Sequence, residues 1–159
     1  LILVGYGMGK DTETLKRTFK DNAYILLIPV GTIAGTLIGG ALAALLLPLN
    51  MRESLAVACG FGWYTYSAVY LAEVHSADLG AIAFLSNVSR EIFAIILIPI
   101  VVRFFGPYSA VSMSGATSMD VTLPLLTHYS GHKITAAAVL HGAALSFITP
   151  ILLPFLIGF

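Results

Sequence analysis

Long blocks of apolar residues, separated by short polar stretches, form the dominant pattern of this sequence. The blocks approach or exceed the roughly 20 residues that an α-helix needs to cross the hydrocarbon core of a bilayer. We therefore predict an all-α, polytopic transmembrane bundle that forms a single transmembrane domain over residues 1–159. The expected spans lie near residues 1–9, which would be the truncated end of a helix, and near residues 23–47, 54–72, 79–104, 112–128 and 134–158.

The block at residues 79–104 carries polar residues at its centre. Asn87, Arg90 and Glu91 have the spacing i, i+3, i+4, which places them on one face of a helix. A charge in the middle of a bilayer costs about 2.5–3.5 kcal/mol on insertion scales, so it persists where it faces a protein interior or a watery cavity. This helix is predicted to form one wall of a buried polar site. The alternative is a structural ion pair of Arg90 with Glu91 or Asp120 that locks helices together.

Two other blocks contain residues that weaken a helix. The block at residues 54–72 carries a Gly-Phe-Gly run at 60–62, and the block at 112–128 carries Pro124 shortly after Asp120. Glycine and proline disfavour a helix interior, and backbone unwinds in a membrane only where it lines a cavity. We predict two discontinuous helices, broken or re-entrant. Because a regular span precedes each of them, they suggest an inverted repeat, which is common in secondary transporters that bind substrate where broken helices meet. The alternative for the first block is a continuous helix.

Composition supports a membrane setting and excludes several functions. Hydrophobic residues make up 58% of the chain and charged residues 10%, against about 25% charged residues in soluble domains. A formal net charge of zero gives no basic field for nucleic acid. The single cysteine has no metal-ligand spacing and no glycine-rich nucleotide loop is present, so we expect no metal and no organic cofactor. No nucleophile–base spacing is recognisable, so we expect no enzyme; the alternative is an intramembrane hydrolase with Ser118 or Thr117 beside His141. Half of the lysine and arginine residues fall within 10–22, which the positive-inside rule places in the cytoplasm.

The buried acids indicate a site for an ammonium group and a proton. Glu91 and Asp120 can each pair with an ammonium or take up a proton, so a cationic solute and a proton would compete for the same acid. Arg90 or the N-terminus of a half-helix can hold a carboxylate, and aromatic side chains beside the first break can stack on the ammonium. His141 is a candidate proton relay; the alternative is that it only hydrogen-bonds a neighbouring helix.

Three stretches resemble the signature segments of the lysine exporter LysO family: GFGWYTYSA at 60–68, FLSNVSREIFAIILIP at 84–99 and GATSMDVTLP at 115–124. They follow in family order and cover roughly residues 55–125. The resemblance implies a multi-pass secondary transporter of the inner membrane that exports L-lysine and its analogues from the cytoplasm. The site residues that it carries over are Trp63, Tyr64, Asn87, Arg90, Glu91, Thr117, Ser118 and Asp120.

In this interpretation Glu91 and Asp120 bind the ammonium and the proton, and Arg90 orients the carboxylate or tunes the acids. Neutral amide and hydroxyl groups supply further hydrogen bonds. Export is expected to be coupled to proton entry by antiport. The alternatives are transport of lysine or another small solute coupled to Na⁺, held by unwound carbonyls near Gly62 and Gly115, and a membrane scaffold that transports nothing.

A repeated glycine spacing bears on assembly. Gly31, Gly35 and Gly39 form a small-xxx-small pattern, which favours either a dimer interface or close packing within one bundle. Members of the LysO family are nearly twice as long as this chain. We therefore expect either a homodimer or pairing with a missing N-terminal half.

Overall fold

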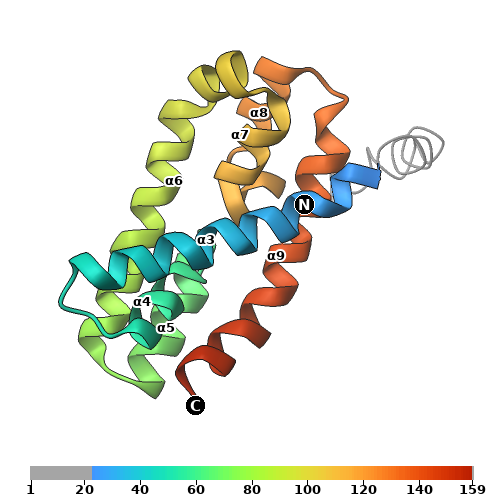
Figure 1. The fold of residues 1–159 in the computed structure, drawn as a ribbon. Helices are drawn as coiled ribbons and strands as arrows, with labels where there is room; N and C mark the ends of the chain where they lie inside the picture. Colours follow the sequence, from blue (N-terminus) through green and yellow to red (C-terminus); the bar gives the residue numbers. More distant parts are fainter. Residues whose placement is uncertain (1–22, 159) are drawn as a thin grey trace.

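A computed structural model describes residues 23–158, and every regular element in that range is helical (Figure 1). The all-α prediction is therefore confirmed. The expected span at residues 1–9 and the charged segment at 10–22 lie outside the described residues. In chain order the elements are η1 (Ala23–Leu26), α3 (Leu27–Leu46), α4 (Met51–Ala58), α5 (Tyr64–Val74), α6 (Ala77–Phe105), α7 (Pro107–Ser114), η2 (Gly115–Met119), α8 (Leu123–Ser130) and α9 (Ile134–Ile157).

Three long helices, α3, α6 and α9, form the frame of the molecule. The longest, α6, has 29 residues and extends about 43 Å at 1.5 Å per residue. Within the described residues, α3 and α9 are long and apolar enough to cross a membrane by length and composition. Large apolar side chains face outward on all three helices, with exposed fractions of 86% at Leu46, 62% at Phe93 and 80% at Phe147. Such a surface is typical of a protein surrounded by lipid or by further protein.

Two short helices begin earlier than the predicted spans. The span near residues 54–72 starts with α4 at Met51, because Asn50 and Glu53 form a capping box in which each side chain accepts from the other's backbone N–H at 2.9 Å. The span near 112–128 starts with α7 at Pro107, directly after Gly106. Gly106 has a φ of 86°, which ends α6, and proline suits a first turn because its missing N–H is not needed there.

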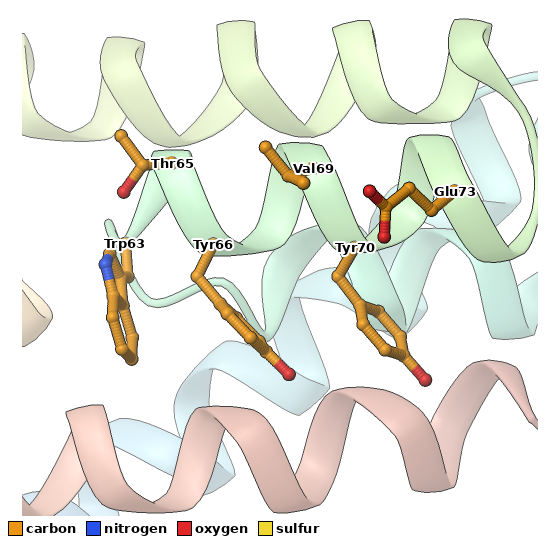
Figure 2. Close-up of a pocket in the computed structure, with 6 residues that line it drawn as sticks. All are labelled: Trp63, Thr65, Tyr66, Val69, Tyr70 and Glu73. Carbon is orange, nitrogen blue, oxygen red and sulfur yellow. The ribbon is translucent and has the colours of Figure 1, made fainter.

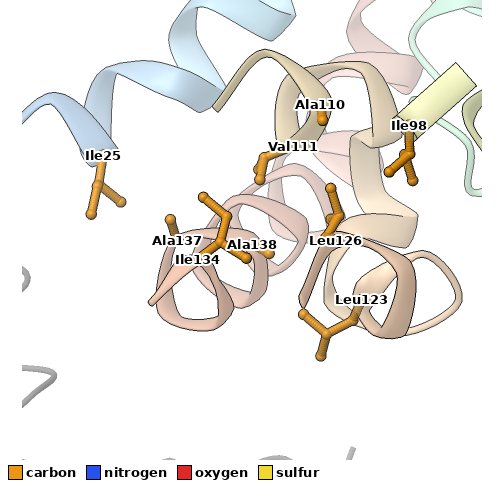
Figure 3. Packing of buried hydrophobic residues seen from close by; sticks show 9 residues of the cluster. All are labelled: Ile25, Ile98, Ala110, Val111, Leu123, Leu126, Ile134, Ala137 and Ala138. Carbon is orange, nitrogen blue, oxygen red and sulfur yellow. The ribbon is translucent and has the colours of Figure 1, made fainter. Parts of the chain in front are cut away.

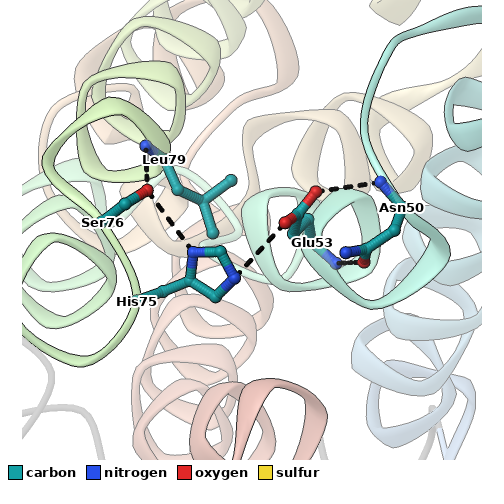
Figure 4. Close-up of polar contacts among 5 residues, drawn as sticks. All are labelled: Asn50, Glu53, His75, Ser76 and Leu79. Atoms are coloured by element: carbon teal, nitrogen blue, oxygen red, sulfur yellow. Dashed lines mark hydrogen bonds and ion pairs between the residues drawn. The ribbon is translucent and has the colours of Figure 1, made fainter.

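The short helices form two hairpins that approach the centre from opposite ends of α6. His75 Nε2 lies 3.3 Å from Glu53 Oε1, so the end of α5 returns to the start of α4 (Figure 4). Ser76 Oγ, which accepts from Leu79 N at 3.2 Å, then starts α6 at the same place. Figure 1 shows α4 and α5 beside one end of α6, and α7 and α8 beside the other end.

The turns of the two hairpins meet inside the molecule. We call residues 59–63 the first tip and residues 115–122 the second tip. Ala116 N of the second tip donates to Phe61 O of the first tip at 2.8 Å, and the Phe61 side chain is fully buried. Helix α9 passes the second tip closely, because a Cβ at Gly142 would lie 2.7 Å from Ala116 O. The fold thus places two irregular backbone segments against each other, between long helices.

Small and branched apolar residues pack the second hairpin against α6 and α9. Ala110 and Val111 of α7, Leu126 of α8 and Ile98 of α6 are fully buried in one cluster with the start of α9 (Figure 3). Alanines of α9 at the contact, Ala137 among them, allow this approach because they add little volume between the backbones. The hairpin is thereby fixed on both of its long neighbours.

The glycine pattern of α3 does not pack within the described bundle. A Cβ at Gly31, Gly35 or Gly39 would meet nothing within 4 Å. The close contact of α3 lies instead at Gly40, where a Cβ would be 3.0 Å from the Cβ of Ala58. Within residues 23–158, these three glycines therefore do not mediate close helix packing inside the bundle.

Candidate functional site

Asn87 of α6 shapes the first tip. Its side chain is 2% exposed. The amide oxygen accepts from Gly62 N at 2.8 Å, and the amide nitrogen donates to Val57 O at 3.1 Å and to Ala83 O at 2.9 Å. These bonds occupy both donor hydrogens of the amide, which leaves it little capacity for a ligand. The approach also requires glycine at position 60, since a Cβ there would lie 2.5 Å from Asn87 Nδ2.

Hydrogen bonds within the second tip fold it on itself. The Thr117 side chain is 7% exposed, and its hydroxyl donates to Ser114 O at 2.8 Å. The Thr117 carbonyl accepts from both the backbone N and the hydroxyl of Thr122 at 3.0 Å. Gly115 has a φ of 67°, and a Cβ at this position would collide with Phe61 O. The hydroxyl of Thr117 therefore stabilises the conformation of the second tip. Thr117 also borders the central cavity between the two tips.

Glu91 and Asp120 line one cavity, which lies where the two tips meet. The cavity has a volume of about 350 Å³. Glu91 is half-buried on α6, whereas Asp120 is exposed at the second tip, where its Oδ1 accepts from Val121 N at 2.6 Å. The other lining residues are Gly62, Trp63, Tyr64, Thr65, Ala116, Thr117, Met119, Val121 and Ser146.

The N-terminal end of α5 opens on the same cavity through Tyr64 and Thr65. The residue before the helix, Trp63, provides no side-chain cap. The first N–H groups of a helix have no intrahelical acceptor and carry partial positive charge. The cavity therefore combines two carboxylates with one positive helix end, a set that complements a cationic amino acid.

Two aromatic side chains from the sequence prediction also border this cavity. Tyr64 is half-buried and packs edge-on against Phe84 of α6, with ring centroids 5.6 Å apart. Trp63 is 36% exposed and lies 5.1 Å from the ring of Tyr66. Tyr64 is thus fixed by packing, whereas the Trp63 side chain remains partly accessible.

Arg90 faces a different cavity from its neighbour Glu91. Its Nε donates to Met113 O at 3.4 Å, and its guanidinium lies against Gly115, where a Cβ would be 3.1 Å from Nη2. It borders a space of about 360 Å³ between α3, α4 and α6. Within residues 23–158, no carboxylate lies within 4.0 Å of the guanidinium, so neither of the ion pairs considered above is formed. The cation interacts instead with the C-terminal end of α7, where the helix dipole is negative.

Ser118 and His141 belong to a buried network away from the cavity. Both side chains are fully buried. Ser118 Oγ donates to Ala138 O at 2.8 Å and lies 3.1 Å from His141 Nδ1, while His141 Nε2 lies 2.9 Å from Thr32 Oγ1. Thr32 Oγ1 in turn lies 2.6 Å from Ser112 Oγ. The network links α3, α7, the second tip and α9.

The sequence prediction missed Thr32, Ser112 and Gly60. Thr32 and Ser112 are single hydroxyl residues in apolar stretches, and nothing in their spacing marks them as partners of His141. Gly60 belongs to a noted motif, but its need for a missing Cβ comes from Asn87, a residue 27 positions later in the chain.

The fold and the cavity together define a class of protein. Helices with exposed apolar side chains surround a cavity that contains two carboxylates, at the junction of two irregular hairpin tips, and such a junction is where many membrane transporters bind their substrates. The family model described as lysine exporter LysO matches residues 1–157. The chain belongs to the lysine exporter LysO family, which makes it a membrane protein of a transporter family.

Two relatives support this assignment. The chain is 39% identical over 155 residues to "Lysine exporter LysO" of Escherichia coli K12, an alignment that covers 98% of this chain and 51% of the relative. It is 31% identical over 159 residues to "Putative lysine exporter" of Haemophilus influenzae, which covers 100% of this chain and 80% of that protein. The chain thus spans about half the length of the Escherichia coli relative. No solved structure matches it significantly.

Proposed function

We propose that this chain forms the substrate site of a secondary transporter that exports L-lysine from the cytoplasm. The observation that carries the proposal is the shared cavity of Glu91 and Asp120 at the junction of the tips. The names of the two relatives point to the same substrate. A volume of about 350 Å³ falls within the range of small-molecule sites.

The charges of the cavity match those of lysine. The two carboxylates pair with the two ammonium groups, and the uncapped N-terminal end of α5 receives the carboxylate. In this arrangement Arg90 is not a ligand. It holds the C-terminal end of α7, and with it the second tip, in the position that closes the cavity.

Coupling to protons follows from the same acids. A proton and an ammonium group neutralise the same carboxylate, so each displaces the other, and lysine leaves as a proton enters. Sodium coupling would need free carbonyls at the tips. Two of them, Phe61 O and Thr117 O, already accept hydrogen bonds within the tips, which favours the proton.

The hairpins of the described residues fit a re-entrant topology inside one transmembrane domain. Because the ends of α4–α5 meet through His75 and Glu53, this hairpin enters and leaves the inner membrane from one face. The α7–α8 hairpin lies beside the other end of α6. We infer that it enters from the opposite face and that the two hairpins form an inverted pair. The helices α3, α6 and α9 cross the membrane.

The open glycine face of α3 is the contact that we assign to a second subunit or to a further half of the transporter. Gly31, Gly35 and Gly39 leave room for a close helix neighbour. Cross-linking from cysteine at position 35 tests this part of the proposal.

Labelled-lysine counterflow in proteoliposomes tests the function. Glu91→Gln and Asp120→Asn each remove a charge-assisted bond worth about 1.5–3 kcal/mol, so exchange should fall roughly 10- to 100-fold. Asp78→Asn, an exposed acid in the first turn of α6, is the matched control and should exchange at the wild-type rate. Wild-type exchange that survives both cavity variants would refute the site, and a lysine exchange insensitive to a pH gradient would refute proton coupling.

A further inference from the structure

An open groove of about 390 Å³ runs along the outer side of α5 (Figure 2). Two rows of side chains border it. The aromatic row consists of Trp63, Tyr66 and Tyr70, and the second row of Thr65, Val69 and Glu73. Each row follows from helical spacing, because residues three or four positions apart share a face. None of Tyr66, Tyr70 or Glu73 has a role in the central cavity.

The rings of the aromatic row follow one another along the groove. The centroids of Trp63 and Tyr66 lie 5.1 Å apart, and those of Tyr66 and Tyr70 lie 5.8 Å apart with ring planes 17° from parallel. Tyr66 and Tyr70 are held from behind by the buried cluster that includes Leu153 of α9. The faces of aromatic rings attract organic cations by about 0.5–2 kcal/mol.

Glu73 supplies a negative charge at the far end of the groove. Its side chain is exposed in the last turn of α5, and within residues 23–158 it forms no ion pair. An acid beside stacked rings recognises an ammonium group and disfavours an anion. The near end of the groove adjoins the central cavity, because Trp63 and Thr65 line both spaces.

We propose that this groove is a second binding site, which holds the side-chain ammonium of a cationic amino acid between the protein surface and the central cavity. Glu73 captures the ammonium, and the rings of Tyr70, Tyr66 and Trp63 carry it toward Glu91. The choice of substrate rests on the proposed function, whereas the recognition of an ammonium group rests on the groove alone.

Trp63 provides the measurement, because it is the single tryptophan of the sequence. We would titrate L-lysine into the purified protein carrying Glu91→Gln and Asp120→Asn, in which the central acids no longer bind, and follow tryptophan emission. The emission should change saturably. Adding Glu73→Gln or Tyr70→Leu should raise the half-saturating concentration about three- to tenfold, while Tyr70→Phe and Asp78→Asn should leave it unchanged.

The choice of probe separates the sources of the ammonium group. Nε-acetyl-L-lysine lacks the side-chain charge and should give no response, and phosphoethanolamine tests a lipid headgroup. A response to acetyl-lysine equal to that of lysine overturns the proposal, as does displacement of lysine by phosphoethanolamine at equal concentration. An unchanged titration in Glu73→Gln also overturns it.

Transport kinetics separate failure of the groove from failure of the proposed function. With the central acids intact, Glu73→Gln should raise the KM for lysine about three- to tenfold and leave the maximal rate unchanged. If wild type transports lysine and Glu73→Gln matches it in KM, the groove is wrong and the function stands. If wild type transports no lysine but the Glu73-dependent emission change persists, the groove stands and the proposed transport function is wrong.

Discussion

Replacing Gly60 by alanine tests how the first tip is built. The new Cβ would lie 2.5 Å from Nδ2, 2.7 Å from Oδ1 and 2.8 Å from Cγ of Asn87. All three atoms belong to one fully engaged amide, so the amide must move away from Gly62 N and from the carbonyl of Val57. The lost hydrogen bonds are worth about 1 kcal/mol each, and a buried polar group left without a partner costs about 1–3 kcal/mol. We expect Gly60→Ala to lower the free energy of unfolding by about 2–4 kcal/mol.

Thermal unfolding of the detergent-solubilised protein, followed by size-exclusion chromatography, measures this loss. The matched control is Gly39→Ala, because a Cβ there meets nothing within 4 Å and alanine favours a helix by about 1 kcal/mol over glycine. Gly39→Ala should therefore be neutral or stabilising in the size-exclusion fraction that contains the single chain, in which the proposed contact of the α3 glycine face is not formed. Asn87→Ala should destabilise as Gly60→Ala does, and the double variant should cost less than the sum, since both changes break the same bonds. A Gly60→Ala protein as stable as Gly39→Ala, or strict additivity with Asn87→Ala, would refute the reasoning.

Two further predictions concern the second tip and the buried histidine. Gly115→Ala places a Cβ against Phe61 O at a φ of 67°. This change should separate the tips, lower the free energy of unfolding by about 3 kcal/mol or more and abolish lysine counterflow. A variant with the wild-type melting temperature and exchange rate would contradict the close contact of the tips. His141→Gln keeps a polar side chain between Thr32 and Ser118, so it should lower the melting temperature by a few degrees and leave the dependence of transport on the pH gradient unchanged. Loss of proton coupling in a well-folded His141→Gln protein would instead restore the role of proton relay.

The sequence predicted the helical blocks and their weak points because both are local properties. Long apolar runs specify helices, and the Gly-Phe-Gly run and the Asp-to-Pro stretch fall where the structure has its two tips. The starts of α4 and α7 were also encoded locally. Asn50 and Glu53 have the spacing of a capping box, and Gly106-Pro107 is a stop signal followed by a start signal.

The return of each hairpin to its own end could not be predicted in this way. Hydropathy shows that a segment is apolar. It does not show whether the chain, after each tip, continues across the molecule or turns back to the end from which it came. That direction is set by long-range contacts, such as His75 with Glu53 and Ala116 with Phe61, between residues that share no sequence pattern. The buried network of His141 is missed for the same reason, since its partner Thr32 lies 109 positions earlier in the chain.

The different roles of Arg90 and Glu91 follow from helix geometry. Consecutive residues are about 100° apart around a helix, so two neighbouring charges rarely serve the same space. Arg90 turns toward the C-terminal end of α7, and Glu91 turns toward the cavity that it shares with Asp120. This separation explains how a half-buried cation and two acids coexist without forming an ion pair among the described residues. Because Arg90 contacts a helix end and not an acid, both carboxylates stay unpaired among the described residues, which is what the proposed exchange of a cationic amino acid for a proton requires.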